Sequence, residues 1–131
     1  MTRTAQARLL RAARAAASKA YAPYSKFKVG AAVLDDKDRI HTGCNIENAS
    51  FGLSICAERV AVFKAVSEGA KAIKAVAVYA GSKELTFPCG ACLQVLCEFG
   101  SDAEVILSNG KQTRLFHLRD LLPHGFTLKK R

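Results

Sequence analysis

Hydrophobic residues recur with a helical period at the start of this chain. Leu9, Ala13 and Ala17 follow one another at intervals of four, with arginines between them, which predicts an amphipathic helix within residues 1–20. Pro23 should end this helix, because proline lacks a backbone donor and disfavours helical geometry in the residue before it. The Arg-rich, acid-free composition also suits a mitochondrial targeting peptide, but the helical pattern favours a folded helix.

Extended and helical patterns alternate through the rest of the chain. Apolar residues 27–34 and 40–45 flank the Asp-rich cluster 35–38, which is typical of a β-hairpin. The later segments are expected, in chain order, as a helix over 55–68, a strand over 73–79, a helix over 89–99, strands over 103–108 and 113–116, and a short helix over 117–122. This order predicts an α/β fold in which helices cover one or both faces of a sheet.

Length and composition narrow the class of protein. The chain has 131 residues, of which 50% are apolar, so residues 1–131 are expected to form one domain with an ordinary core. No apolar run approaches the roughly 18 residues of a membrane span, and no secretory signal is recognisable. Five cysteines suit a reducing compartment, where thiols stay available as metal ligands. A cytoplasmic protein without a membrane partner is therefore expected.

Two short motifs carry the candidate chemistry: Cys56-Ala57-Glu58 and Pro88-Cys89-Gly90-Ala91-Cys92. Three thiolates can hold Zn²⁺ at three corners of a tetrahedron and leave the fourth corner for water, as in catalytic sites. Neither motif offers a fourth Cys or His, which a structural zinc site would need. The arrangement is that of zinc-dependent base deaminases, in which a glutamate beside the metal moves protons. Glu58 occupies that position.

Both motifs are expected at helix starts, and this places a demand on their geometry. Residues three apart are neighbours on a helix, so Cys89 and Cys92 can hold one ion. Residues two apart are not, so Cys56 and Glu58 can share a site only if Cys56 lies at or before the first turn. Three thiolates leave a zinc site with a net negative charge, which the helix N-termini and Arg59 are expected to offset.

Some residues outside these motifs could bind a sugar and a base. Asn45 and Glu47 would share one face of an extended segment and offer a donor and acceptors to sugar hydroxyls, and this interpretation is favoured over the alternative that the pair simply begins a loop. Phe27 could stack on a base or belong to the core. Two remaining cysteines and three histidines lack partners at ligand spacing and are expected to be packing or surface residues: Cys44, Cys97, His41, His117 and His124.

Taken together, five segments in the same order resemble the small, homotetrameric type of cytidine deaminase. They are residues 24–32, 45–50, 56–59, 88–92 and 121–126, and the likeness runs from about Ala22 to Leu128. The resemblance implies a mixed five-stranded sheet flanked by helices in three layers. It also implies one Zn²⁺ per chain on Cys56, Cys89 and Cys92, and hydrolysis of cytidine and deoxycytidine to uridine and deoxyuridine, with release of ammonia, in pyrimidine salvage.

The resemblance further assigns residues around a nucleoside substrate. It implies that Asn45 and Glu47 bind the ribose hydroxyl and that Phe27 lies against the pyrimidine ring. It places Ala57 among the substrate contacts, Arg59 on the zinc thiolates, and Phe126 at the base of a neighbouring subunit, so the active sites of a homotetramer would be shared. The chain departs from the family at Leu93, where arginine is common. This leaves the metal ligands intact, and the change is expected to bear on a subunit contact or on an acidic neighbour of that arginine.

Three other functions compete with this interpretation. The net charge of +9 suits a polynucleotide deaminase or nucleic-acid binder, but the basic residues are spread along the chain without an aromatic cluster, so no nucleic-acid partner is expected. A deaminase of another cytosine compound, such as blasticidin S, would share the zinc motifs, but such relatives lack the pair Asn45 and Glu47. A zinc-stabilised interaction module would need no Glu58.

Overall fold

A mixed sheet of five strands forms the centre of the computed structural model, which describes residues 1–130. The strands lie in the order β2-β1-β3-β4-β5, and only β3 and β4 are parallel neighbours. They are β1 (Val29–Asp35), β2 (Ile40–Cys44), β3 (Ile73–Ala80), β4 (Glu104–Ser108) and β5 (Thr113–His117). The mixed five-stranded sheet expected from the sequence is confirmed.

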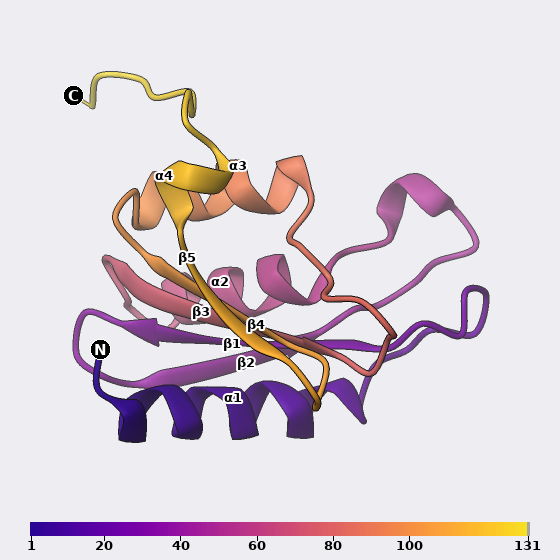
Figure 1. Ribbon diagram of the computed structural model, residues 1–131. Helices are drawn as coiled ribbons and strands as arrows, with labels where there is room; N and C mark the ends of the chain where they lie inside the picture. Colours follow the sequence, from indigo (N-terminus) through magenta and orange to yellow (C-terminus); the bar gives the residue numbers. More distant parts are fainter. Residues whose placement is uncertain (131) are drawn as a thin grey trace.

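Helices cover both faces of the sheet and complete three layers. Helix α1 (Arg3–Ala17) lies alone on one face, and α2 (Ala57–Ser67) and α3 (Gly90–Phe99) lie on the other (Figure 1). The short helices η1 (Phe51–Leu53) and α4 (Leu118–Leu121) belong to connections. None of the helices within residues 1–130 has the length and apolar character needed to cross a membrane.

The amphipathic first helix is confirmed, and its apolar stripe explains where it lies. Thr2 caps it by accepting a hydrogen bond from the Ala5 N–H, and Leu9 and Ala13 are fully buried in a cluster with the adjoining face of the sheet. Gly30 of β1 lets the two backbones approach closely, since a Cβ there would lie 2.0 Å from the Ala13 carbonyl oxygen. The segment that resembled a targeting peptide is therefore part of the core.

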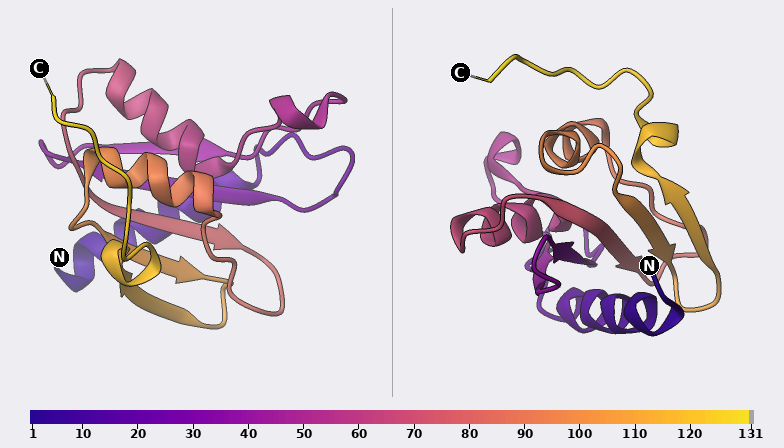
Figure 2. Two further views of the ribbon diagram at one scale, coloured as in Figure 1. Left: turned by 90° about the horizontal axis from the view of Figure 1, so that it is seen from above. Right: turned by 90° about the vertical axis from the view of Figure 1, so that its left-hand side faces the viewer.

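The candidate site lies at the sheet face opposite α1, which α2 and α3 cover. Ala31 and Val33 of β1 pack there with α2 and α3, while Ala32 faces α1, so β1 is buried on both faces and is apolar from Val29 to Leu34. The helices α2 and α3 lie together on this face, and their N-termini come close to one another (Figure 2). Both cysteine motifs stand at those N-termini.

Most strand boundaries differ from the sequence-based expectation by one or two residues, and two of the differences concern the site. Strand β1 begins at Val29 rather than Phe27, and β2 ends at Cys44, so Asn45 and Glu47 lie beyond it. Lys26, just before this point, has a left-handed backbone (φ 62°), which interrupts the extended run. At this point the Asn45 N–H still donates to the Val29 carbonyl, but the Val29 N–H is bonded to the Asn45 side chain instead of to a backbone carbonyl.

Candidate active site

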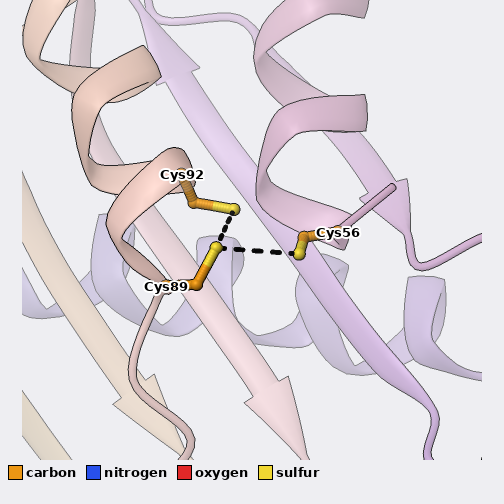
Figure 3. A group of neighbouring side chains, drawn as sticks. All are labelled: Cys56, Cys89 and Cys92. Atoms are coloured by element: carbon orange, nitrogen blue, oxygen red, sulfur yellow. Dashed lines mark hydrogen bonds between the residues drawn. The ribbon is translucent and has the colours of Figure 1, made fainter. Parts of the chain in front are cut away.

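Three cysteine side chains from two helix starts converge on one point. Cys56 and Cys89 are the N-cap residues of α2 and α3, with extended backbones, and neither side chain caps its helix, so both thiols are free to turn toward each other. Cys92 follows one turn into α3, and its Sγ lies 3.5 Å from that of Cys89. The Sγ atoms of Cys56 and Cys89 are 3.9 Å apart (Figure 3). Cys56 thus precedes the first turn, as the sequence required.

This sulfur cluster fits one zinc ion. All three sulfurs lie within 4.8 Å of one another, and a tetrahedral site with zinc–sulfur bonds of about 2.3 Å has sulfur–sulfur edges of roughly 3.8 Å. The measured separations of 3.5 and 3.9 Å fall on either side of that edge. Among residues 1–130 this is the one group of His, Cys, Asp or Glu side chains placed to share a metal. The three residues proposed from spacing are brought together.

Arg59 supplies positive charge to the sulfur cluster. Its Nη2 donates to Cys56 Sγ at 3.5 Å, while its Nε is buried with no hydrogen-bond partner among the described residues. Contact with the Cys92 thiol, together with this guanidinium, lowers the pKa of Cys56 to about 5 against the opposing effect of burial. A half-buried cation and two helix N-termini therefore favour the thiolate form that a metal requires.

Glu58 is a buried carboxyl beside these thiols. It is the second residue of α2, only 4% of it is exposed, and it lines the same pocket as Cys56 and Cys89. Burial, together with the negative charge of Cys56, raises the pKa of Glu58 to about 7. No salt bridge neutralises it among the residues described. Its chemistry is that of a group able to accept and release a proton near neutral pH.

The thiols and Glu58 border a pocket of about 350 Å³, a volume suited to a small molecule. Its lining comes from four segments that are separate in sequence, within residues 25–29, 45–47, 54–58 and 86–89. Paired backbone hydrogen bonds between Ile46 and Ile55, of 3.0 and 2.9 Å, hold the second segment beside the third. The predicted sugar-binding pair is therefore fixed next to the first metal ligand.

Asn45 and Glu47 both line this pocket, although neither is on a strand. The Asn45 amide donates to the Phe27 carbonyl at 2.8 Å and accepts from the Val29 N–H at 2.9 Å. The Glu47 carboxylate accepts from Ser25 Oγ and from two backbone N–H groups, those of Tyr24 and Ser25. The Ser25 hydroxyl first and these amides next lower the pKa of Glu47, so it is ionised.

Phe27 and Ala57 lie in the pocket lining, but Phe126 does not. Phe27 is 40% exposed rather than a core residue, and Ala57 opens α2, where the first N–H groups lack intrahelical partners. Phe126 is 66% exposed, and its backbone exchanges hydrogen bonds of 2.7 and 3.0 Å with the Gln94 side chain. Its expected contact with the base in a neighbouring copy stays a prediction.

Sequence reasoning missed several lining residues. Ser25, Thr86 and Phe87 contribute to the pocket, and the Phe87 ring packs against Phe116 of β5 at 5.2 Å between centroids. Phe87 directly precedes the second metal motif, and a large apolar residue in that position was the available signal. The contact of Ser25 with Glu47 spans 22 residues and left no local signal.

The other chemically notable residues lie apart from the site. Cys44 and Cys97 are half-buried free thiols, as expected for packing residues. His41 is buried at the β-hairpin, where its Nε2 lies 2.9 Å from Asp35. Leu93, which stands where arginine was expected, is 8% exposed and belongs to the core under α3.

Comparison with known proteins gives a consistent result. The family described as the cytidine and deoxycytidylate deaminase zinc-binding region matches residues 3–108. Cytidine deaminase of Sporosarcina psychrophila is 48% identical over 105 residues, which cover 79% of this chain and 77% of that relative. Cytidine deaminase of Halalkalibacterium halodurans is 48% identical over 110 residues, 82% of this chain and 83% of the relative. The crystal structure of cytidine deaminase from Burkholderia pseudomallei aligns with a TM-score of 0.88 at 46% identity, covering 96% of this chain and 100% of that one.

Proposed function

Because the chain belongs to the cytidine and deoxycytidylate deaminase family, we propose that it hydrolyses cytidine and deoxycytidine to uridine and deoxyuridine with release of ammonia. One observation carries the proposal: the buried Glu58, the converging thiols and the pair Asn45 and Glu47 line a single pocket. A metal-stabilised structural module would need neither a pocket beside its ion nor a buried carboxyl within it.

Cys56, Cys89 and Cys92 would hold the zinc, one ion per chain, and leave one coordination position free. When bound, zinc supplies the acidity and orientation that let water act as a nucleophile at neutral pH. Arg59 offsets the charge of three thiolates, because a guanidinium stays protonated throughout the working pH range. The cluster would then remain assembled while protons move nearby.

Glu58 is proposed as the proton carrier. It takes a proton from the attacking water and delivers it to N3 of the pyrimidine ring while oxygen adds to C4. It then carries the proton of the new hydroxyl to the amino nitrogen, so that the C4–N bond breaks, ammonia leaves and the 4-keto product forms. A carboxyl with its pKa raised to about 7 can do both, since neither protonation state is strongly disfavoured.

The remaining lining residues would orient the nucleoside. Asn45 and Glu47 each keep hydrogen-bonding capacity beyond their bonds to the chain, so they can bind ribose hydroxyls. The exposed ring of Phe27 offers a face to the base, and the free N–H of Ala57 offers a donor at the start of α2. Positioning of this kind holds the reacting carbon against the water and Glu58.

We further propose a homotetramer with shared active sites. Several large apolar side chains are mostly exposed on a single chain, which is typical of surfaces that bind another protein: Phe51, Leu53, Phe126 and Leu128. Two of them project with η1, and the other two belong to the segment after α4, which leads away from the sheet in Figure 1. A neighbouring copy would cover these residues, and Phe126 would reach its pocket.

Domain organisation and location complete the proposal. Residues 1–131 are proposed to act as one deaminase domain, a view supported by the single sheet and by the family match over residues 3–108. Five free thiols, three of them needed as metal ligands, support a reducing location such as the cytoplasm. There the reaction would serve pyrimidine salvage.

An absorbance assay tests the proposed activity. Purified protein is incubated with cytidine and the fall in ultraviolet absorbance is followed, with ammonia measured in parallel. Chelation should abolish turnover and added Zn²⁺ should restore it. Absence of turnover with the zinc-loaded protein, or deamination only of single-stranded oligonucleotides, would refute the proposal.

The metal ligands are tested by zinc content. Cys89→Ala should lose its zinc and its activity, because two thiols remain where three are required. Cys44→Ala, which removes a half-buried thiol outside the cluster, serves as the control and should keep one zinc per chain. Full zinc content in Cys89→Ala would contradict the site.

A further inference from the structure

Ser25 joins two parts of the pocket that the proposed function uses separately. Its hydroxyl donates to Glu47 Oε2 and accepts from the Phe27 N–H at 3.0 Å. One side chain of the segment before β1 therefore contacts both the candidate sugar ligand and the backbone of the candidate base-stacking residue. Ser25 itself lies in the pocket lining.

The two oxygens of Glu47 are held in different ways. Oε1 accepts from the N–H groups of Tyr24 and Ser25, at 3.0 and 3.1 Å, which uses both of its lone pairs. Oε2 accepts only from the Ser25 hydroxyl, so one lone pair remains for a ligand. The direction of that remaining lone pair depends on Ser25, because this hydroxyl is the one side-chain partner that fixes the carboxylate plane.

The Phe27 backbone is held from both sides. Its N–H donates to Ser25 Oγ, and its C=O accepts from Asn45 Nδ2 at 2.8 Å. Asn45 also accepts from the Val29 N–H at 2.9 Å. Segments 25–29 and 45–47 are thus tied together by these side-chain bonds as well as by a backbone bond from the Asn45 N–H to the Val29 carbonyl at 3.2 Å, and loss of the Ser25 hydroxyl would release one of the ties.

We propose that Ser25 is a positioning residue that aims Glu47 at the sugar hydroxyls, so that discrimination for a hydroxylated sugar depends on the Ser25 hydroxyl. This inference rests on the proposed function. It separates Ser25 from a serine that only stabilises its loop, because a loop-stabilising role would affect every substrate equally.

The test compares cytidine with 2′,3′-dideoxycytidine, which lacks both ring hydroxyls. In Ser25→Ala, KM for cytidine should rise about tenfold, the effect expected from misaligning one charge-assisted hydrogen bond. The kcat for cytidine should change much less, and kcat/KM for the dideoxy compound should stay near the wild-type value. The ratio of the two kcat/KM values should therefore fall about tenfold.

Matched variants separate positioning from folding. Ser25→Thr keeps the hydroxyl and should retain the ratio, whereas Ser25→Cys, a weaker donor, should lower it. Ser67→Ala removes an exposed hydroxyl at the far end of α2, bonded to the Lys64 carbonyl, and should leave the ratio unchanged. Because Ser25 would act through Glu47, adding Ser25→Ala to Glu47→Gln should not lower the ratio further.

The outcomes are distinguishable. A zinc-loaded wild-type protein without cytidine turnover overturns the proposed function and this inference with it. An active wild-type enzyme whose ratio is unchanged in Ser25→Ala and Ser25→Cys overturns the inference alone, as does an equal loss of kcat/KM for both substrates.

Discussion

At the scale of single residues, the environment of Glu58 determines what it can do. An exposed glutamate near the start of a helix would be ionised and would serve as a helix-dipole partner. In this structure the carboxyl is almost completely buried beside thiols, and burial, with the charge of Cys56, raises its pKa to about 7. Burial thus gives this carboxyl the proton affinity that the proposed role of proton carrier requires.

Glu58→Gln should keep the fold and one zinc per chain but lose turnover. The amide fills the same space and leaves all three thiols in place, whereas it cannot accept a proton; we expect kcat to fall by about 10²–10⁴ or more. Steady-state assays with cytidine, beside zinc analysis, measure both properties. A kcat close to wild type would remove Glu58 from the mechanism.

At the scale of elements, close approach between helices and the sheet places the site. Gly30 allows α1 to touch β1, and Gly43 allows α2 to touch β2, since a Cβ on Gly43 would lie 2.5 Å from the Ala57 carbonyl oxygen. The second contact involves the first residue of the helix that carries Cys56 and Glu58. The depth at which α2 lies on the sheet therefore helps to set the position of these two side chains.

Gly30→Ala should be strongly destabilising. Its Cβ would lie 2.0 Å from the Ala13 carbonyl oxygen and 2.4 Å from the Ala17 amide nitrogen, both of which are backbone atoms that cannot rotate away. Overpacking of this kind costs about 1–3 kcal/mol or more of unfolding free energy. Gly52→Ala, where no atom lies within 4 Å, is the control. Urea unfolding measures the stability of both variants. Equal stabilities of Gly30→Ala and Gly52→Ala would refute the close approach of α1 to β1.

The β1–β2 hairpin should give the protein an acid-sensitive stability. Burial favours neutral Asp35, but hydrogen bonds from His41, from the Arg39 and Lys37 backbone and from the Arg39 side chain outweigh it, and hold the pKa of Asp35 well below the ordinary 3.8. Below about pH 4 the unfolded chain therefore binds a proton that the folded chain does not, so stability falls as pH falls.

Asp35→Asn should remove that part of the pH dependence. The slope of unfolding free energy against pH, measured by urea unfolding between about pH 2.5 and 4, should decrease by up to about 1.4 kcal/mol per pH unit. Asp120→Asn, at an exposed position on α4, is the comparison. An unchanged slope in Asp35→Asn would show that the buried carboxylate is not linked to folding.

At the scale of the whole molecule, the segment after α4 lies outside the pocket of its own chain. The chain after α4 is anchored to α3 through Gln94, which holds the Phe126 backbone by two hydrogen bonds. The Phe126 ring itself remains 66% exposed. An anchored backbone with an exposed aromatic ring suits a side chain presented to another copy of the protein.

Phe126→Ala should therefore lower kcat/KM without removing zinc. Light scattering is expected to give the wild type a mass of four chains of 14.1 kDa, and the variant should keep that mass if Phe126 contacts substrate rather than maintaining the assembly. Loss of an aromatic contact of about 1 kcal/mol or more predicts a decrease of at least fivefold. A monomeric, fully active wild type would refute the shared site.

Much of the fold was predictable because its elements depend on short-range patterns. The four-residue spacing of Leu9 and Ala13 was sufficient to predict the helix α1. The i, i+3 spacing of Cys89 and Cys92 was sufficient to predict that their two thiols lie close enough to share one metal ion. The predicted boundaries of the strands near the pocket, the start of β1 and the end of β2, were less accurate. There, the Asn45 side chain bonds to the backbone of Phe27 and Val29, and such contacts between distant segments leave no local pattern in the sequence.

The sequence by itself determined the order of elements and the three candidate metal ligands, and it singled out Glu58 as the candidate proton carrier, because hydrophobic period and motif spacing are local features of the chain. Only the tertiary structure decided that Glu58 is buried, that Ser25 bonds to Glu47, and that Phe126 lies outside its own pocket. Those properties come from contacts between segments more than 20 residues apart, whose pairing depends on how the helices pack on the sheet.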